Sequence, residues 1–243
     1  MVGAVRSGRI SEERIDDSVR KLLSLKSRMG LHRGRFVDEA VVSERVATEE
    51  HRAILREVAD RSLTMLTNDG LLPIDPTRLG NAVNISVQKG AVDPSPPQIA
   101  AKLAAAFPGI RSFTLRPEQA ANVREEVFHA AAQVNVVIIS LFVPRNRLGE
   151  AAPLRAVDRE LIRRITAERP GRVVAMAYGN PHLVRALPEM SAFLVGYGER
   201  GWYGNQEVYF DTFIAALTGR LSPSGKLPVF VSDDYPIGHG MSY

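Results

Sequence analysis

From about residue 80 onward, the sequence alternates between two kinds of segment: short apolar runs rich in residues that favour β-strands, and segments with helical periodicity. This alternation strongly restricts the fold. The run at 135–143 is almost entirely apolar, which is typical of a parallel strand buried on both faces. The alternation favours a doubly wound, mostly parallel sheet with helices on both faces, a three-layer α/β sandwich. We expect strands at 82–87, 110–115, 135–143, 172–178 and 192–196, and helices at 98–107, 118–133, 156–168 and 206–217.

The N-terminal part of the chain has a helical pattern instead. Ser11 is a typical helix N-cap followed by two acidic residues, and Gly30 suits the position just after a helix end. Between them runs an apolar stripe: Ile15, Val19, Leu22, Leu23 and Met29. Residues 31–46 have no clear period, and Thr48 is expected to cap a second helix. We therefore predict a helical linker over residues 1–65 and an α/β sandwich domain over residues 66–243.

Composition excludes several kinds of function. The chain has no cysteine, so disulfides, thiolate nucleophiles and cysteine-based zinc sites are excluded. Its five histidines are scattered without metal-ligand spacing, and we expect neither a metal nor an organic cofactor. The net charge is +4, but the arginines are interleaved with acids, which favours a solvated helical surface over nucleic-acid binding. No apolar run is long enough to predict a membrane span, and no signal-peptide pattern is visible.

Ligands of open α/β sheets bind at the carboxyl ends of the strands, so the segments after the predicted strands are the candidate sites. The segment after 135–143 contains Arg145, Arg147 and Glu150, and a carboxyl group in such a place can serve as a general acid. The segment after 172–178 contains Asn180 and His182, and the pair Asn180-Pro181 is expected to cap a short helix.

The segment after 192–196 has the richest chemistry. Its residues 197–206 include Glu199, Arg200, Trp202 and Tyr203, and Trp202 is the only tryptophan of the chain. Aromatic faces with polar neighbours suit sugar rings, so these four side chains are candidate substrate-binding residues. Packing of Trp202 against a neighbouring domain is the alternative interpretation, and both roles are compatible. The chain contains no phosphate-binding P-loop and no serine-hydrolase elbow motif.

Four sequence strings have no explanation in periodicity and indicate ancestry. Two lie near the end of the chain, LSPSGKLPV at 221–229 and YPIGHGMSY at 235–243. The others are DGLLPI at 69–74 and YGNPH at 178–182. Together they resemble the C-terminal α/β domain of family 3 glycoside hydrolases, and the last favours the β-N-acetylglucosaminidase branch over the β-glucosidases. Residues 4–23 resemble the last barrel helix and interdomain linker of the same family, so the chain is expected to begin where a catalytic barrel ends.

The resemblance implies a domain of a retaining β-glycosidase, in which an aspartate of the barrel is the nucleophile. Glu150 is the best positional match to the acid/base glutamate that many β-glucosidase-type members carry on this domain, although the surrounding residues differ. The barrel motifs of the N-acetylglucosaminidase branch are not present, and Asp233 in the Ser-Asp-Asp-Tyr string is expected to be a surface residue. The implied partners are the barrel domain and a β-linked saccharide.

The resemblance also predicts that this chain alone has no glycosidase activity, because the two carboxyl groups of a retaining site must be about 5 to 5.5 Å apart. The alternative function is a carbohydrate-binding, docking or assembly module without catalysis. Exposed apolar stripes on the first two helices would favour self-association in that case.

Overall fold

The computed structural model describes residues 1–88, 94–119, 121–143, 154–198 and 206–243. The chain divides into two compact units, Met1–His51 and Arg52–Tyr243. The first unit contains α1 (Val2–Arg6), α2 (Glu12–Arg28), the 3-10 helix η1 (Glu39–Val41) and α3 (Val42–Arg45). Among the described residues, no helix combines the length and the apolar character that crossing a bilayer requires.

The local signals predicted for α2 are confirmed. The Ser11 side chain accepts a hydrogen bond from the Arg14 backbone N–H, and Gly30 has a φ of +73° just beyond the helix end. Thr48 likewise accepts a bond from the His51 backbone N–H at the start of α4 (Glu49–Ser62). The predicted linker at 31–46 contains two short helical turns, η1 and α3. The Asp38 carboxylate starts the first of them by accepting from the Ala40 N–H.

The second unit is built on a six-stranded sheet in the order β1-β6-β5-β4-β2-β3. All neighbouring pairs are parallel except β1 with β6. This confirms the doubly wound, mostly parallel α/β fold. The strands are β1 (Thr64–Asn68), β2 (Ala82–Gln88), β3 (Arg111–Leu115), β4 (Val136–Phe142), β5 (Val173–Tyr178) and β6 (Ala192–Gly196).

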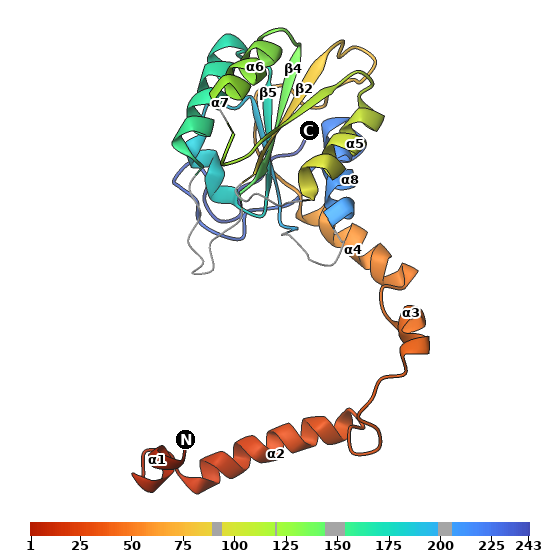
Figure 1. Ribbon diagram of the computed structural model, residues 1–243, viewed down its shortest axis with the longest axis vertical. Helices are drawn as coiled ribbons and strands as arrows, with labels where there is room; N and C mark the ends of the chain where they lie inside the picture. Colours follow the sequence, from red (N-terminus) through yellow and green to blue (C-terminus); the bar gives the residue numbers. More distant parts are fainter. Residues whose placement is uncertain (89–93, 120, 144–153, 199–205) are drawn as a thin grey trace. The chain divides into compact units, whose positions relative to one another are not determined.

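Helices cover both faces of the sheet. Figure 1 shows α6 (Ala121–Ala132) and α7 (Ala156–Glu168) on one face, and α5 (Ser95–Ala106) and α8 (Gln206–Leu217) on the other. Alternate residues of β4 enter the two cores: Val137 and Ile139 pack with α6 and α7, and Ile138 with α5 and α8. Both faces of the central strands are therefore apolar, which is why the sequence of β4 shows no alternation.

Strand β1 was not predicted, because its residues Thr64–Asn68 directly follow a helical pattern and end in the turn signal at Asn68. Its pairing is entirely non-local. Thr64 lies opposite Val195 in β6, and Met65 forms an isolated bridge with Met241 at the end of the chain. Such a strand is defined by partners far away in the sequence, and local propensity does not reveal it.

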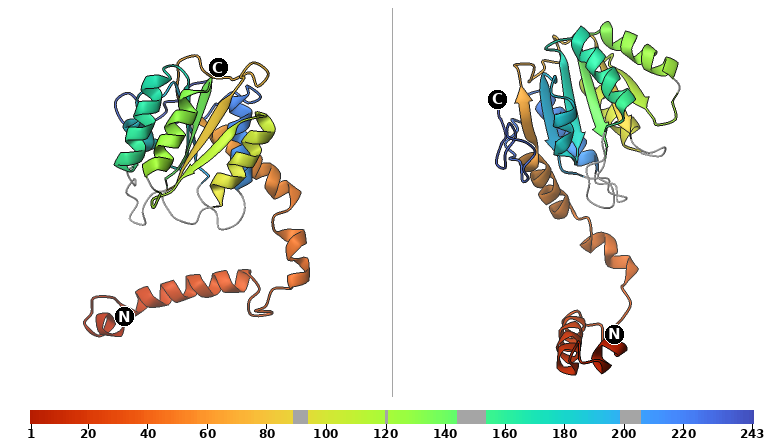
Figure 2. Two further views of the ribbon diagram at one scale, coloured as in Figure 1. Left: turned by 45° about the horizontal axis from the view of Figure 1, so that its top comes forward. Right: turned by 90° about the vertical axis from the view of Figure 1, so that its left-hand side faces the viewer.

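The C-terminal tail, residues 221–243, packs beside β1 (Figure 2). Its two recognisable strings bond to each other: the Leu227 N–H donates to the His239 carbonyl, and the Gly238 N–H donates to the Leu227 carbonyl. The tail also reaches the helix-to-strand corner, where the Gly225 N–H donates to the Leu63 carbonyl over 2.9 Å. A ring nitrogen of His239 lies 2.8 Å from the Leu66 carbonyl oxygen.

Two glycines of these strings are required by close backbone contacts. A Cβ atom at Gly225 would lie 2.4 Å from the Ser62 carbonyl oxygen, and one at Gly240 would lie 2.3 Å from the Gly225 carbonyl oxygen. Neither space accommodates a side chain, because the opposing atoms are backbone. The two strings of the tail, at 221–229 and 235–243, therefore have a structural role, because they pack closely along the edge of the sheet that β1 forms. We call this packing the structural clasp. Asp233 and Asp234 lie exposed in the turn between the two strings.

Candidate functional site

The direction of winding reverses between β2 and β4. Strand β2 has β3 on one side and β4 on the other, so the connections that leave β2 and β4 diverge at their carboxyl ends. Open α/β sheets bind ligands in the crevice at such a switch point. We call the ends of β2 to β6, together with the first turns of α6 and α7, the carboxyl edge.

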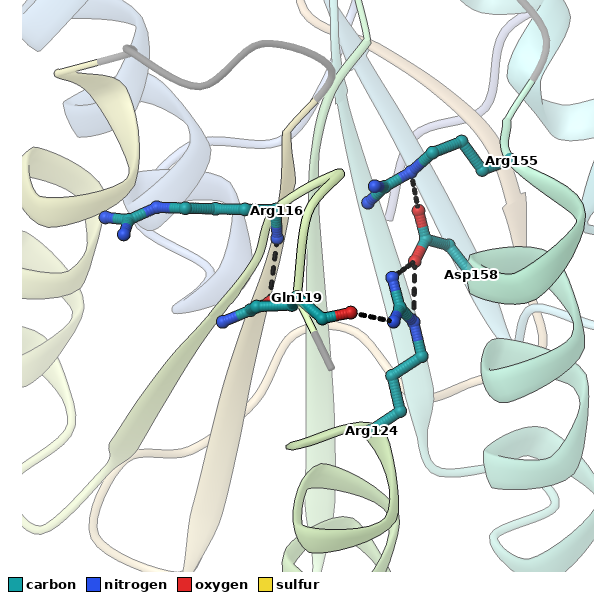
Figure 3. A network of polar contacts seen from close by, with 5 residues as sticks. All are labelled: Arg116, Gln119, Arg124, Arg155 and Asp158. Atoms are coloured by element: carbon teal, nitrogen blue, oxygen red, sulfur yellow. Dashed lines mark hydrogen bonds and ion pairs between the residues drawn. The ribbon is translucent and has the colours of Figure 1, made fainter. Parts of the chain in front are cut away.

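A buried ionic network lies at this edge, and Figure 3 shows it from close by. Asp158, in the first turn of α7, is fully buried. One carboxylate oxygen accepts from Arg124 Nε and Nη2, at 3.4 and 3.3 Å, and the other accepts from Arg155 Nε. Burial of a carboxylate destabilises the folded state unless the charge is paired and hydrogen-bonded. Asp158 is paired with two guanidinium groups. The three side chains together carry one excess positive charge.

The network continues toward the end of β3. Arg124 Nη1 donates to the Gln119 carbonyl over 3.0 Å, and the Gln119 side-chain oxygen accepts from the Arg116 backbone N–H over 2.8 Å. The Arg116 side chain points away from Asp158 (Figure 3). The network thus links the end of β3 to the first turns of α6 and α7, and it holds Arg155 and Arg124 in fixed positions at the carboxyl edge.

Arg155 has hydrogen-bond donors that the network does not use. Its side chain is 26% exposed, and its Nε–H is used by Asp158. Its two terminal nitrogens are shielded from solvent and have no hydrogen-bond acceptor among the residues that the structure describes. In Figure 3 the guanidinium group points away from α7. A guanidinium held in place at one end and free at the other can bind the oxygen atoms of a hydroxyl, carboxylate or phosphoryl group.

Aromatic rings lie under the ends of β4 and β5. Phe142 and Tyr178 stack with ring centroids 4.5 Å apart, and Phe210 of α8 meets both rings edge to face. Tyr178 is only 7% exposed, and burial raises the pKa of its hydroxyl, so the phenol stays neutral. These rings form the apolar floor of the carboxyl edge and belong to the core.

The predicted cap at Asn180 is confirmed. Its side-chain oxygen accepts from the His182 backbone N–H over 3.1 Å and starts the 3-10 helix η2 (Pro181–Ala186). The preceding Gly179 has a φ of +90°, a conformation that disfavours other residues. The string at 178–182 therefore has a structural role in turning the chain after β5.

The predicted site residues lie outside the described parts of the chain. These are Arg145, Arg147 and Glu150, which follow β4, and Glu199, Arg200, Trp202 and Tyr203, which follow β6. The structure does describe the strands that precede them, and both strands end at the carboxyl edge. In the described residues, no group of three histidine, aspartate or glutamate side chains is arranged to hold a metal ion.

Sequence reasoning missed the network of Asp158, Arg124 and Arg155. An aspartate in the first turn of a helix is ordinarily a surface residue that favours the helix dipole. The one available signal was the position of Arg155 and Asp158, which directly follow the segment after the central strand.

The known proteins that this chain resembles are named as glycosidases. No protein-family model matches the chain. Over 249 residues it is 24% identical to "Beta-N-acetylglucosaminidase/beta-glucosidase" of Cellulomonas fimi, a match that covers 94% of this chain and 41% of that protein. It is 26% identical to "Beta-glucosidase C" of Emericella nidulans over 236 residues, again 94% of this chain but 33% of the relative.

Among solved structures, the chain is similar to a glycoside hydrolase family 3 β-N-acetylglucosaminidase from Paenibacillus sp. str. FPU-7. The TM-score is 0.69 at 24% identity, over 95% of this chain and 42% of that one, so this likeness concerns the fold. The structure shows an α/β domain, and the relatives that it resembles over most of its length are named as glycosidases. The solved structure is named as a member of glycoside hydrolase family 3, which agrees with the predicted resemblance. The chain spans 33% to 42% of the length of these relatives, consistent with the expected C-terminal domain.

Proposed function

We propose that this chain is the C-terminal domain of a retaining β-glycosidase and that its carboxyl edge forms one wall of a saccharide site. A catalytic barrel, outside these 243 residues, completes that site. The observation that carries the proposal is the relationship over 94% of this chain to only 41% of a relative named as a β-N-acetylglucosaminidase/β-glucosidase. The substrate class is a β-linked glucoside or N-acetylglucosaminide.

The chemistry is divided between the two domains in this proposal. Retaining hydrolysis needs a nucleophilic carboxylate and an acid/base carboxyl group on opposite sides of the scissile bond, about 5 to 5.5 Å apart. The barrel supplies the nucleophile. Glu150, which directly follows the central strand β4, is the candidate acid/base. The part of the predicted 1–65 linker that precedes β1 connects this domain to the barrel.

Arg155 supports a role in substrate recognition. Its two terminal nitrogens, which have no acceptor among the described residues, suit the hydroxyl oxygens of a sugar, and the buried carboxylate of Asp158 fixes its orientation. Trp202 and Tyr203 supply faces on which a sugar ring stacks, and Arg145, Arg147, Glu199 and Arg200 supply polar contacts around its rim.

Reconstitution tests the proposal. Hydrolysis of a chromogenic N-acetyl-β-glucosaminide and of the matching β-glucoside is measured for the chain alone, for a separately produced family 3 barrel, and for the mixture. We expect no activity from the chain alone and a higher rate from the mixture than from the barrel. Glu150→Gln should remove that gain, whereas Glu168→Gln, an exposed acid at the end of α7, should retain it. Turnover by the purified chain alone would contradict the proposal.

One observation favours a second role as a docking or assembly module. The apolar stripe predicted for α2 is exposed in the structure, where Val19, Leu22, Leu23 and Met29 are between 44% and 65% accessible. A helix with such a stripe normally buries it against a partner. Light scattering distinguishes the two cases: a dimer that Leu22→Glu/Leu23→Glu dissociates supports self-association, and a monomer leaves the barrel as the partner.

A further inference from the structure

A second concave site lies at the opposite, amino edge of the sheet. It is a pocket of about 470 Å³, lined by residues that precede the parallel strands. Leu79 lies just before β2, Asn135 and Val136 lie at the start of β4, and Arg172 directly precedes β5. No described residue of the carboxyl edge lines this pocket, so the two sites are separate.

The pocket has an excess of positive charge. Three arginines line it, Arg78, Arg169 and Arg172, against a single acid, Asp75. Asp75 is already satisfied by the Thr77 hydroxyl and backbone N–H, at 2.7 and 2.9 Å, and by Arg78 Nε at 3.5 Å. The Thr77 hydrogen bonds lower the pKa of Asp75, so its carboxylate stays ionised. Since arginine remains protonated, the lining carries two uncompensated positive charges.

A tight turn presents two of these arginines. Helix α7 ends at Glu168, and the Arg169 backbone N–H still donates to the Ile165 carbonyl over 2.9 Å. The Arg172 N–H then donates to the Arg169 carbonyl over 3.2 Å, and Gly171 between them has a φ of +73°. The backbone therefore determines the spacing of Arg169 and Arg172, which enter the pocket from one rigid turn.

The guanidinium of Arg169 has an unused donor. Its Nε–H is shielded from solvent and has no acceptor among the described residues. Neither Arg169 nor Arg172 forms an ion pair within that part of the chain. A shielded donor without an acceptor is unfavourable, and guanidinium groups that share a pocket repel one another. An anion in the pocket relieves both costs.

We propose that this pocket binds a phosphoryl oxyanion, either inorganic phosphate or the phosphate group of a phosphorylated sugar. Planar guanidinium groups match the oxygens of a phosphoryl group in bidentate geometry, which an ammonium group does not. The cavity volume falls in the range typical of small-molecule sites, so it has room for more than a phosphate ion.

Calorimetric titration of the intact chain tests this proposal, with inorganic phosphate in one arm, glucose 6-phosphate in a second and glucose in a third, at constant ionic strength. We expect saturable binding in the first two arms and none with glucose. Tighter binding of glucose 6-phosphate than of phosphate would identify a sugar phosphate as the better ligand; the reverse would identify the free ion.

The variants distinguish a specific anion site from nonspecific attraction between phosphate and the positive charge of the chain. Arg169→Gln/Arg172→Gln should weaken binding by about tenfold or more, and Arg169→Lys/Arg172→Lys should not restore it. The matched control, Arg159→Gln/Arg163→Gln, removes two exposed charges from α7 and should bind as the native chain does. The single variant Arg172→Gln, at an exposed position, provides a folded protein if the double variant is unstable. No saturable binding to the native chain, or an equal loss in the control, would overturn the proposal.

Discussion

The C-terminal tail and the carboxyl edge contrast in what the sequence reveals about them. The tail contains the most recognisable strings of the chain, yet its residues pack, turn and bond to the backbone beside β1. The carboxyl edge has one recognisable string among its described residues, at 178–182 after β5. Its buried ionic network lies outside that string and includes donors with no acceptor among those residues. Recognisable residues can therefore mark the fold of a domain, while its chemistry depends on side chains that only burial distinguishes.

The largest effect on stability is expected at the carboxyl edge. Asp158→Ala leaves Arg124 and Arg155 without their shared carboxylate, in positions where their side chains are only 14% and 26% exposed. The free energy of unfolding should fall by about 3 to 5 kcal/mol, measured by urea denaturation. Asp211→Ala is the matched control, because that acid pairs with Lys102 at the surface and should cost less than about 1 kcal/mol. Equal losses would contradict the stabilising role of this buried network.

The tail should show a smaller but clear loss. Gly225→Ala places a methyl group against the Ser62 and Leu63 carbonyl oxygens, at 2.4 and 2.7 Å, and should cost about 1 to 3 kcal/mol. Gly109→Ala separates this clash from backbone strain, because Gly109 has a φ of +87° but open space around it. Thermal denaturation of both variants measures the difference. A greater loss for Gly109→Ala would contradict the structural clasp.

Arg155 should affect activity more than stability. In the reconstituted enzyme, Arg155→Gln is expected to lower kcat/KM by about tenfold, which corresponds to about 1.4 kcal/mol, since it removes the two donors that the proposed function assigns to substrate. A rise in KM at constant kcat would indicate a uniform binding contact; a fall in kcat would indicate a contact made in the transition state. Unchanged kinetics in a folded variant would exclude Arg155 from the saccharide site.

The smallest effect is a pH dependence that appears only in alkaline solution. Burial raises the pKa of Tyr178 above its ordinary value near 10, so the folded protein retains this proton when the unfolded chain has lost it. The free energy of unfolding is therefore unaffected below pH 10 and falls above it, by about 1.4 kcal/mol per pH unit for one proton.

Tyr178→Phe keeps the stacking on Phe142 and should reduce that alkaline slope by one proton. Chemical denaturation at several alkaline pH values measures it. An unchanged slope would assign the pH dependence to the other tyrosines whose pKa burial also raises: Tyr197, Tyr235 and Tyr243.

Most of the parallel sheet could be predicted, because each strand has a local signal. The expected strand at 192–196 and the helices at 156–168 and 206–217 match β6, α7 and α8 residue for residue. Other boundaries differ by one to three residues; α5, for example, begins at Ser95, where two prolines occupy its first turn. The candidate site was predictable only as an edge of the sheet. The burial of Asp158 depends on the packing of α6 against α7, which no local pattern encodes.

By itself, the sequence determined the alternation of strands and helices, the capping residues and the resemblance to glycosidase relatives, because periodicity, caps and ancestral strings are local properties of the chain. Only the tertiary structure decided that residues 64–68 form a strand, since that strand depends on β6 and on the tail. It also decided which charged residues lose their contact with water. The Asp158 network and the arginine pocket both arise where segments distant in the sequence bring like or opposite charges into a shared space.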